Sequence, residues 1–407
     1  MNILLLGNGF DLYHKLPTRY DNFLHTVNHL SSVANEDFNT IADVFENKDI
    51  QENDPFIQEC FLAHKEAYEK SVLNKNEMSE MVDLARRNLW FKYLVKTYNN
   101  HEKWIDFEKE IAHVLDVFKH FFKSITPYMN YNHLDNSQYF VIQQFDFFSC
   151  SYDSGKFNGP NKQVYSKYIL EYPFSSGVKV VNKAKIVKDL LNQLHELAKI
   201  LKLYLKIFVE KPLCYIKETN LNRCPAIAYI DKTVTFNYTT SYEKIYNSNS
   251  IFHIHGDVEK KIILGINADN SDNLESIDTA FVEFKKYFQR TQYNTDNEYL
   301  SWFNELNDRY EDLSLVVMGH SLDITDKDII VEIFNKMNEI IIFYHNEDAK
   351  ATYITNLIKI FGKEDFDKLK TQRKLTFCSL NMDFTEYLKH RKMISQKHFI
   401  DTILNAV

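Results

Sequence analysis

Glycine is scarce in this chain of 407 residues. It occurs nine times, where average usage would give about 28. A glycine retained against such a background is expected where a side chain would not fit. The nine positions therefore indicate where the backbone turns sharply or meets another group closely. They are Gly7, Gly9, Gly155, Gly159, Gly177, Gly256, Gly265, Gly319 and Gly362.

Other absences exclude several classes of protein. The five cysteines are odd in number and form no C-x-x-C pair, which argues against a disulfide framework and a structural zinc site and favours a reducing compartment. No stretch approaches the roughly 18 apolar residues of a membrane span, and the N-terminus lacks a signal sequence. A net charge of −8 gives no general attraction to nucleic acid or anionic lipid. We therefore expect a cytoplasmic protein without a nucleic-acid or membrane partner.

Short apolar runs at both ends of the chain predict an α/β fold. Residues 3–6 form such a run, and helical segments separate the later ones. This alternation is typical of a mostly parallel, Rossmann-like sheet with helices on both faces. The first run has no partner nearby in sequence, so we expect it to join the later sheet. The later runs are residues 233–236, 251–255, 262–264, 313–318, 340–344 and 375–378.

The middle of the chain is predicted to be helical. Apolar stripes at three- and four-residue spacing cover residues 56–72, 81–98, 104–122 and 184–209. We therefore predict two domains. Residues 1–20 and 230–407 would form a Rossmann-like nucleotide-binding domain, and residues 21–229 a large all-helical insertion.

Two polar motifs end the first two expected strands, and open α/β sheets bind ligands at these carboxyl ends. The turn Gly7-Asn8-Gly9 offers backbone amides that can approach a phosphate, although an ordinary tight turn is an open alternative. It departs from the dehydrogenase fingerprint because Leu12 stands where the third glycine would be. Asn237 could hold a water or a sugar hydroxyl through its carboxamide, or cap the next helix.

Two further motifs end the next strands. His255, beside the permissive Gly256, is a candidate general base. His253 would share a strand face with His255, but a third ligand at recognisable spacing is missing, so we predict no metal site. Gly319 would let a ligand approach the backbone. Ser321 or Asp326 would cap the following helix, and the segment lacks the G-x-S-x-G pattern of a serine hydrolase.

A pair of carboxylates lies on one of the expected helices. Asp106 and Glu108 are two residues apart and do not share a helix face, so their spacing does not support paired-carboxylate catalysis. We interpret them as solvated or interface residues.

Taken in order, these motifs resemble the AbiH family of bacterial proteins, which is implicated in abortive infection against phage. The likeness spans nearly the whole chain. It rests on Gly7-Asn8-Gly9-Phe10-Asp11, Leu16-Pro17-Thr18 with Tyr20, Trp104-x-Asp106-x-Glu108, Phe236-Asn237-Tyr238-Thr239, Ile254-His255-Gly256 and Gly319-His320-Ser321-Leu322.

More remotely, the set is similar to the sirtuin-like NAD-binding fold. The sirtuin G-A-G-x-S, Q-N-I-D, H-G and G-T-S segments are matched in order by the turn at Gly7, by Asn237 and its neighbours, by His255-Gly256 and by Gly319-His320-Ser321. Thr239 replaces the Asp that would help read the nicotinamide amide. The four-cysteine zinc module of sirtuins is missing, so the resemblance does not imply protein deacetylation.

Sirtuin-like domains in phage defence consume NAD as a class. The resemblance therefore implies that the chain is an NAD+ glycohydrolase, with NAD as its substrate and no metal, releasing nicotinamide and ADP-ribose. His255 and Asn237 would be catalytic. The alternative is a non-catalytic module that binds NAD or ADP-ribose as a signal, and for either we expect a homo-oligomer or a defence-system partner protein. The expected nucleotide contacts are Gly7, Asn8, Gly9, Asp11, Gly319, Ser321 and Asp326.

Overall fold

The structure, a computed structural model, divides into two compact units. Unit 1 comprises Met1–Leu16, Ile216–Asp257 and Asn294–Val407, and unit 2 comprises Pro17–Tyr215 and Val258–Tyr293. These boundaries differ from the predicted ones chiefly in Val258–Tyr293, which groups with the insertion. The described residues are 1–33, 37–100, 105–125, 128–129, 135–151, 161–171, 179–217, 223–227, 230–267, 279–295, 297–309 and 312–381.

Unit 1 contains a six-stranded sheet in the order β11-β10-β9-β1-β7-β8, with every described pair parallel. The first strand lies in the middle, the next two follow on one side and the last three on the other, which is the Rossmann arrangement. The predicted α/β class is confirmed, and so is the pairing of the first run with the later sheet. The strands are β1 (Asn2–Leu6), β7 (Lys232–Thr235), β8 (Ile251–His253), β9 (Ser314–Met318), β10 (Glu339–Tyr344) and β11 (Leu375–Ser379).

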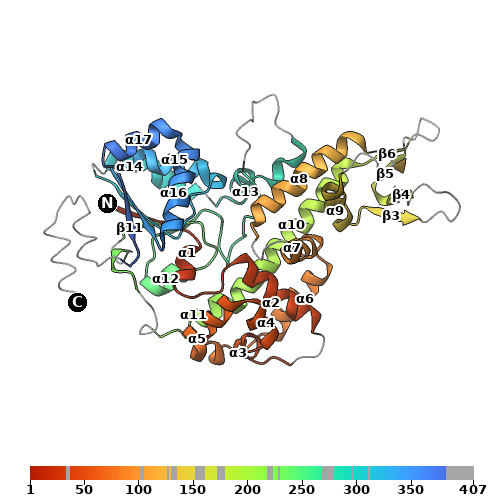
Figure 1. Ribbon diagram of the computed structural model, residues 1–407, viewed down its shortest axis with the longest axis horizontal. Coiled ribbons are helices and arrows are strands. Elements are labelled where there is room, and N and C mark those ends of the chain that lie inside the picture. The colour runs from red at the N-terminus through yellow and green to blue at the C-terminus, as the bar shows by residue number, and fades with distance from the viewer. Residues whose placement is uncertain are drawn as a thin grey trace. The chain divides into compact units, whose positions relative to one another are not determined.

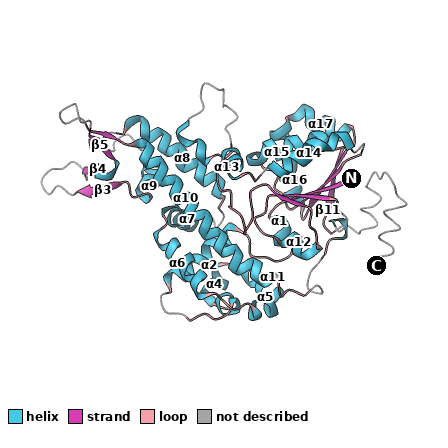
Figure 2. Cartoon of the chain, turned by 180° about the vertical axis from the view of Figure 1, so that it is seen from behind, coloured by secondary structure: helices cyan, strands magenta, loops and turns pink. Residues whose placement is uncertain are grey.

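Helices cover both faces of this sheet. Figures 1 and 2 show α1 and α12 on one side of the strands and α14 to α17 on the other. Side chains alternate along a strand, so Ile3 and Leu5 join the core beneath α14 to α17 while Leu4 and Leu6 are buried on the opposite face. The helices are α1 (Gly9–Tyr13), α12 (Ser241–Tyr246), α14 (Asn297–Arg309), α15 (Lys327–Lys336), α16 (Glu347–Phe361) and α17 (Lys363–Thr371).

Unit 2 is mainly helical. The predicted stripe over residues 81–98 is two helices, because Asn88 takes an extended backbone conformation and its side-chain oxygen accepts from the Phe91 amide at 2.8 Å. The helices are α2 (Tyr20–Ser32), α3 (Ile41–Phe45), α4 (Lys48–Asn53), α5 (Pro55–Lys70), α6 (Lys75–Arg87), α7 (Leu89–Asn100), α8 (Phe107–Ser124), α9 (Asn136–Gln144), α10 (Lys183–Leu205), α11 (Lys211–Leu213) and α13 (Lys286–Tyr293).

The insertion was predicted to be all-helical, but it also contains two small antiparallel sheets. Their strands are two to four residues long, which is too short to show a two-residue periodicity in the sequence. They are β2 (Tyr128–Met129), β3 (Phe148–Ser151), β4 (Asn161–Val164), β5 (Ile169–Glu171) and β6 (Lys179–Val181). The loop glycines Gly155, Gly159 and Gly177 lie outside the described residues.

The predicted strand at residues 262–264 was wrong. This segment is buried but belongs to no sheet, and a side chain supplies hydrogen bonds that a neighbouring strand would have made. Gln289 accepts from the Leu264 amide at 3.2 Å and donates to the Leu264 carbonyl at 3.1 Å. An apolar triplet indicates burial and does not distinguish these two ways of satisfying the backbone.

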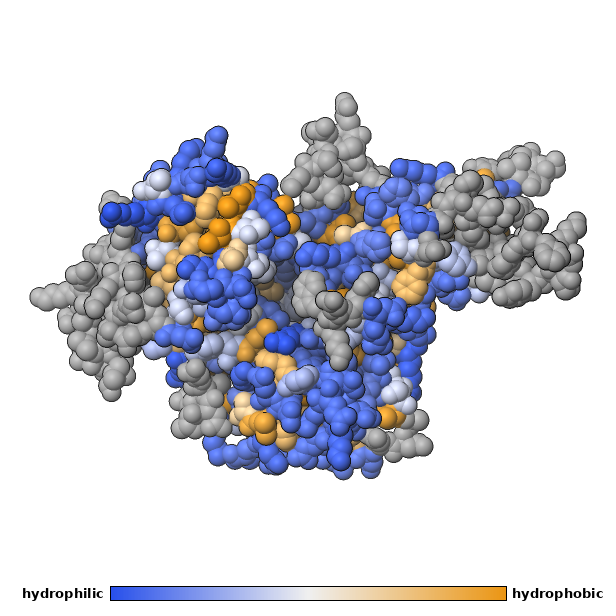
Figure 3. Space-filling view, viewed as in Figure 1, coloured by the Kyte–Doolittle hydropathy of each residue, from blue (hydrophilic) through white to orange (hydrophobic). Residues whose placement is uncertain are grey.

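The helices of the described residues include none that is long and apolar enough to cross a membrane. In the view of Figure 3, hydrophilic residues cover most of the described surface and apolar residues show in separate groups.

Candidate functional site

The loops that follow β1 and β9 meet backbone to backbone. The Gly9 amide donates to the Gly319 carbonyl at 2.8 Å, and the Gly7 amide donates to the Met318 carbonyl at 3.2 Å. A Cβ on Gly9 would lie 2.7 Å from the Gly319 Cα, and a Cβ on Gly319 would lie 2.1 Å from the Phe10 nitrogen. Gly319 also has a φ of +72°, in the left-handed region. Glycine is therefore required on both sides of this contact.

This contact changes how the first glycine turn can act. The amides of Gly7 and Gly9, which were predicted to cradle a phosphate, donate to carbonyls within the protein. Asn8 is exposed at the tip of the turn. The adjacent strands β1 and β9 are the point at which the strand order reverses, which is where open α/β sheets bind nucleotides. The location fits a ligand site, and the group of this turn best placed to reach a ligand is the Asn8 side chain.

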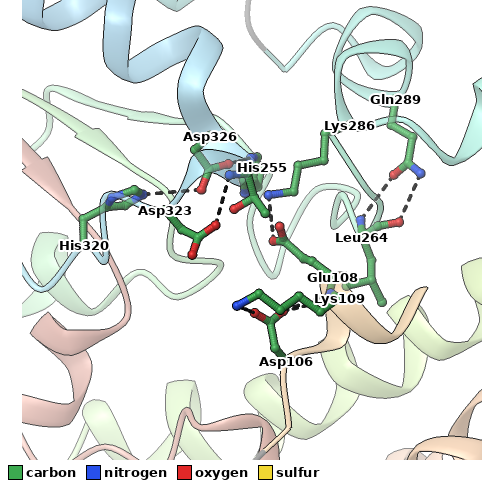
Figure 4. A network of polar contacts seen from close by, with 11 residues as sticks. Asp106, Glu108, Lys109, His255, Leu264, Lys286, Gln289, His320, Asp323 and Asp326 are labelled. Atoms are coloured by element: carbon green, nitrogen blue, oxygen red, sulfur yellow. Dashed lines mark hydrogen bonds and ion pairs between the residues drawn. The ribbon is translucent and has the colours of Figure 1, made fainter. Parts of the chain in front are cut away.

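A buried carboxylate lies between two buried histidines at the same edge of the sheet. His255 Nε2 is 3.5 Å from one oxygen of Asp326, and His320 Nε2 is 3.6 Å from the other. Figure 4 shows this arrangement, and the three residues are only 4–7% exposed. His320 Nδ1 accepts from the Leu322 amide at 2.9 Å, so the proton of a neutral His320 ring is on Nε2, toward Asp326.

The loop between β9 and α15 places Asp326 for this role. Asp326 occupies the N-cap position of α15 yet makes no side-chain capping bond, and Ser321 is exposed. Asp323 instead caps the single 3-10 turn Ile324–Asp326 that leads into α15, accepting from the Thr325 amide at 3.2 Å. Asn356 steadies the loop by donating to the Ser321 carbonyl at 3.0 Å. The carboxylate of Asp326 is consequently directed at the two imidazoles.

His320 is the residue that the sequence alone did not assign. It was noted only as the middle of a strand-end motif, because a histidine with no recognisable spacing to a partner gives no signal in one sequence. Its contact with Asp326 depends on how the loop after β9 turns back.

Asn237 follows β7 with its backbone fixed and its carboxamide buried. The Asn237 amide donates to Thr235 Oγ1 at 3.1 Å, and its carbonyl accepts from His253 Nδ1 at 3.0 Å. Asn237 is 7% exposed, and among the described residues its Nδ2 finds no hydrogen-bond acceptor. It does not cap α12, whose N-cap is Thr240. Burying an amide donor without an acceptor is unfavourable, which points to a ligand or water that completes it.

Phe236 precedes Asn237 in the chain, and its ring packs against both histidines of the cluster. Its ring centroid is 4.2 Å from that of His320 and 5.2 Å from that of His255. In unit 1 His255 therefore lies beside Asp326, and the residue that precedes Asn237 packs against His255.

His253 occupies the last position of β8, between Asn237 and Glu243 of α12. Its Nε2 lies 2.7 Å from Glu243 Oε1, while Nδ1 contacts the Asn237 carbonyl. Burial alone would lower the pKa of His253. The hydrogen bond and charge of Glu243, the Asn237 carbonyl and the charge of Asp257 outweigh burial and raise this pKa above its ordinary value of 6.5. His253 therefore takes part in a hydrogen-bond network rather than in a pair with His255.

Asp11 links α1 to the loop between β7 and α12. Its carboxylate is 1% exposed and accepts hydrogen bonds from Thr239 Oγ1, at 2.7 Å, and from Ser241 Oγ. These partners favour a supporting role for Asp11, which was predicted as a nucleotide contact. The hydrogen bond to Asp11 also occupies the hydroxyl of Thr239, the residue that stands where sirtuins have an Asp.

In unit 2, the two carboxylates noted in the sequence have separate roles. Asp106 caps α8, accepting from the amides of Glu108 at 3.0 Å and Lys109 at 3.2 Å. Glu108 forms a 2.6 Å ion pair with Lys286 of α13, whose side chain is 1% exposed (Figure 4). Of the two roles interpreted from the sequence, solvated or interface, the ion pair with a buried lysine excludes a fully solvated Glu108. Trp104, from the same motif, lies outside the described residues.

The sequence of the chain matches one family model. The model described as "Bacteriophage abortive infection AbiH" matches residues 3–345, most of the chain. The chain belongs to the AbiH family. This membership assigns it a role in abortive infection of phage-infected bacteria. No curated protein and no solved structure matches the chain significantly.

The AbiH match covers both units and the whole strand-end site. It begins within β1 and runs to the end of β10, so it includes every candidate residue from Gly7 to Asp326. It also includes the Glu108–Lys286 pair of unit 2.

For this AbiH protein, we expect Glu108→Gln to lower the free energy of unfolding of unit 2 by about 2 kcal/mol, since it removes the charge that faces the buried Lys286. Thermal or urea unfolding measures the change. Glu66→Gln is the matched control in the same unit, because Glu66 pairs with Lys70 at 2.7 Å but both side chains are about half exposed. The control should cost less than about 1 kcal/mol. Equal losses in the two variants would contradict a special contribution from the buried pair.

Proposed function

We propose that this AbiH protein hydrolyses NAD+ to nicotinamide and ADP-ribose at the strand-end site of unit 1. The observation that carries the proposal is the buried Asn237 amide donor that lacks an acceptor among the described residues. A donor of this kind suits a ribose hydroxyl or a water molecule. The ring of the preceding residue, Phe236, packs against both His255 and His320. The sequence likeness to sirtuin-like NAD-binding motifs supports NAD+ as the substrate.

The reaction needs orientation more than strong acid–base chemistry, because the cationic nicotinamide is already a good leaving group. The bond between C1′ of the ribose and the nicotinamide nitrogen breaks, and its electron pair goes to nicotinamide. Water then bonds to C1′ of the oxocarbenium-like ribose and gives up a proton, which His255 accepts. Asp326, 3.5 Å from His255 Nε2, stabilises the imidazolium that forms.

Other residues have binding and supporting roles in this proposal. Asn237 positions the water or the ribose hydroxyls. Asn8 and Ser321, both exposed, contact the pyrophosphate and the ribose, whereas the space beside Gly319 that was predicted to admit a ligand is filled by the Gly9–Phe10 backbone. Asp11 holds the loop that carries Asn237.

A second candidate function is a sensor that binds NAD or ADP-ribose without cleaving it. The hydrogen bond between Thr239 and Asp11 favours this candidate, because neither side chain is then available to fix the nicotinamide amide. A sensor would retain nucleotide binding and lack turnover.

Incubating the purified protein with NAD+ and following nicotinamide release tests the proposal. We expect Asn237→Ala to lower kcat/KM by about 10²–10³-fold, the effect of removing one preorganised donor. Asn346→Ala is the matched control, because Asn346 is an exposed residue of unit 1 that caps α16. It should cost stability without changing turnover.

The outcomes separate the candidates. Nucleotide binding by the wild type without nicotinamide release would support the sensor and overturn hydrolysis. Turnover that survives in Asn237→Ala would overturn the assignment of Asn237.

A further inference from the structure

We infer that His253, held by Glu243, is a positioning residue that fixes Asn237 for its ligand. The inference rests on the proposed function of the strand-end site and adds a part to it that no sequence motif suggested. His253 does not reach the substrate itself in this scheme, because both of its ring nitrogens are engaged within the protein.

The backbone of Asn237 is held on both sides, which leaves its carboxamide for a ligand. Thr235 Oγ1 accepts from the Asn237 amide at 3.1 Å, and His253 Nδ1 contacts the Asn237 carbonyl at 3.0 Å. Asn237 lies beyond the end of β7, where sheet hydrogen bonds no longer fix the chain. The side chain of His253 replaces those bonds at the residue whose amide must be placed accurately.

Glu243 fixes the imidazole in turn. Its Oε1 lies 2.7 Å from His253 Nε2, and Glu243 belongs to α12, the helix that follows the Asn237 loop. Two hydrogen bonds, between Glu243 and His253 and between His253 and Asn237, therefore connect α12, β8 and the segment that follows β7. A carboxylate that orients a histidine is a common way to set the direction of the other ring nitrogen.

The network is complete when both ring nitrogens of His253 carry protons. Nδ1–H then donates to the Asn237 carbonyl and Nε2–H to Glu243. The charged group facing the ring from α12 is Glu243, and Asp257 acts on it from the segment after β8. Both carboxylates raise the pKa of His253 against the effect of burial, so its imidazolium predominates at pH 6.5 and is lost as the pH rises through the raised value.

Two near-isosteric substitutions separate the nitrogens of His253. The amide nitrogen of His253→Asn takes the place of Nδ1 and can still donate to the Asn237 carbonyl, whereas that of His253→Gln takes the place of Nε2 and reaches toward Glu243. We expect His253→Asn to keep kcat for NAD+ hydrolysis within about threefold of wild type. We expect His253→Gln to lose about 10-fold or more, because a small displacement of a reacting group is costly.

The pH dependence gives a readout that a purely structural role would not move. Wild-type kcat should fall at alkaline pH as His253 loses its proton. His253→Asn should lack that fall, because its amide does not titrate. Glu243→Gln should move the fall to lower pH, since removing the carboxylate lowers the pKa of His253. His120→Gln is the control, because His120 is an exposed histidine that faces Asp116 of the same helix.

A ligand-free measurement separates failure of this inference from failure of the proposed function. The side-chain amide signals of Asn237, assigned from their loss in Asn237→Asp, should shift in ¹⁵N NMR spectra as His253 titrates. If the wild type neither binds nor cleaves NAD+ but these signals still follow His253, the proposed function fails and the positioning stands. If the signals do not follow His253, or if His253→Gln hydrolyses NAD+ as fast as wild type, the positioning role is overturned.

Discussion

Replacing His255 by alanine is expected to lower the rate of nicotinamide release by about 10²–10⁴-fold, the usual contribution of a general base. The expectation follows from the proposed role of His255 as acceptor of the water proton and from its buried place beside Asp326. The affinity for ADP-ribose, measured by calorimetry, should change little. A loss confined to kcat would place the effect in the chemical step.

The matched control is His345→Ala. His345 follows β10 at the same edge of the sheet but is exposed, so turnover should not change. Asp326→Asn should fall between the two, because it keeps the shape of the side chain and removes the charge that stabilises a protonated His255. Undiminished turnover in His255→Ala would remove this histidine from the mechanism.

Gly319→Ala is expected to lower the free energy of unfolding of unit 1 by about 2–5 kcal/mol. The added Cβ would meet the Phe10 nitrogen at 2.1 Å and a backbone φ of +72° would be imposed on a residue with a side chain. The left-handed conformation costs about 1–2 kcal/mol and the forced displacement of packed atoms about 1–3 kcal/mol or more. Hydrogen exchange of peptides from β1 and β9 measures the change.

Gly362→Ala isolates the backbone contribution. Gly362 has a similar φ of +79°, but a Cβ there would meet no atom within 4 Å. It should cost about 1–2 kcal/mol from conformation alone. If Gly319→Ala is no more destabilising than Gly362→Ala, the contact between the two strand-end loops is looser than the structure indicates.

The sequence predicted the strands well because each is a short, continuous apolar run, the pattern of a sheet buried on both faces. It also predicted that the first strand joins the later sheet. The failures have physical causes. Residues 262–264 are equally apolar, but Gln289 satisfies the backbone at Leu264. The break between α6 and α7 depends on one residue, Asn88, whose capping bond no periodicity reveals.

The candidate site was likewise predicted only in part. Asn237 and His255 were predicted as site residues because each lies at or after the end of an expected strand, and Asp326 was predicted as a helix cap and nucleotide contact. His320 and Glu243 were not assigned, since their parts depend on contacts with Asp326 and His253 that arise only when loops turn back on the sheet. The glycine turn was located correctly. The partner of its backbone, the loop at Gly319, required the structure.

The central place of β1 has a consequence for synthesis. Leu6 pairs with Thr235 on one side and with Met318 on the other. The strand that is synthesised first can therefore pair on both sides only after both later strands have been made. At about 5–20 residues per second, a ribosome needs on the order of 15–60 s to reach β9. Throughout that interval the Gly9 amide lacks the carbonyl of Gly319 to which it donates in the complete fold. The strand-end site can therefore assemble only after translation has passed Asp326, and nascent chains shorter than this carry no complete site.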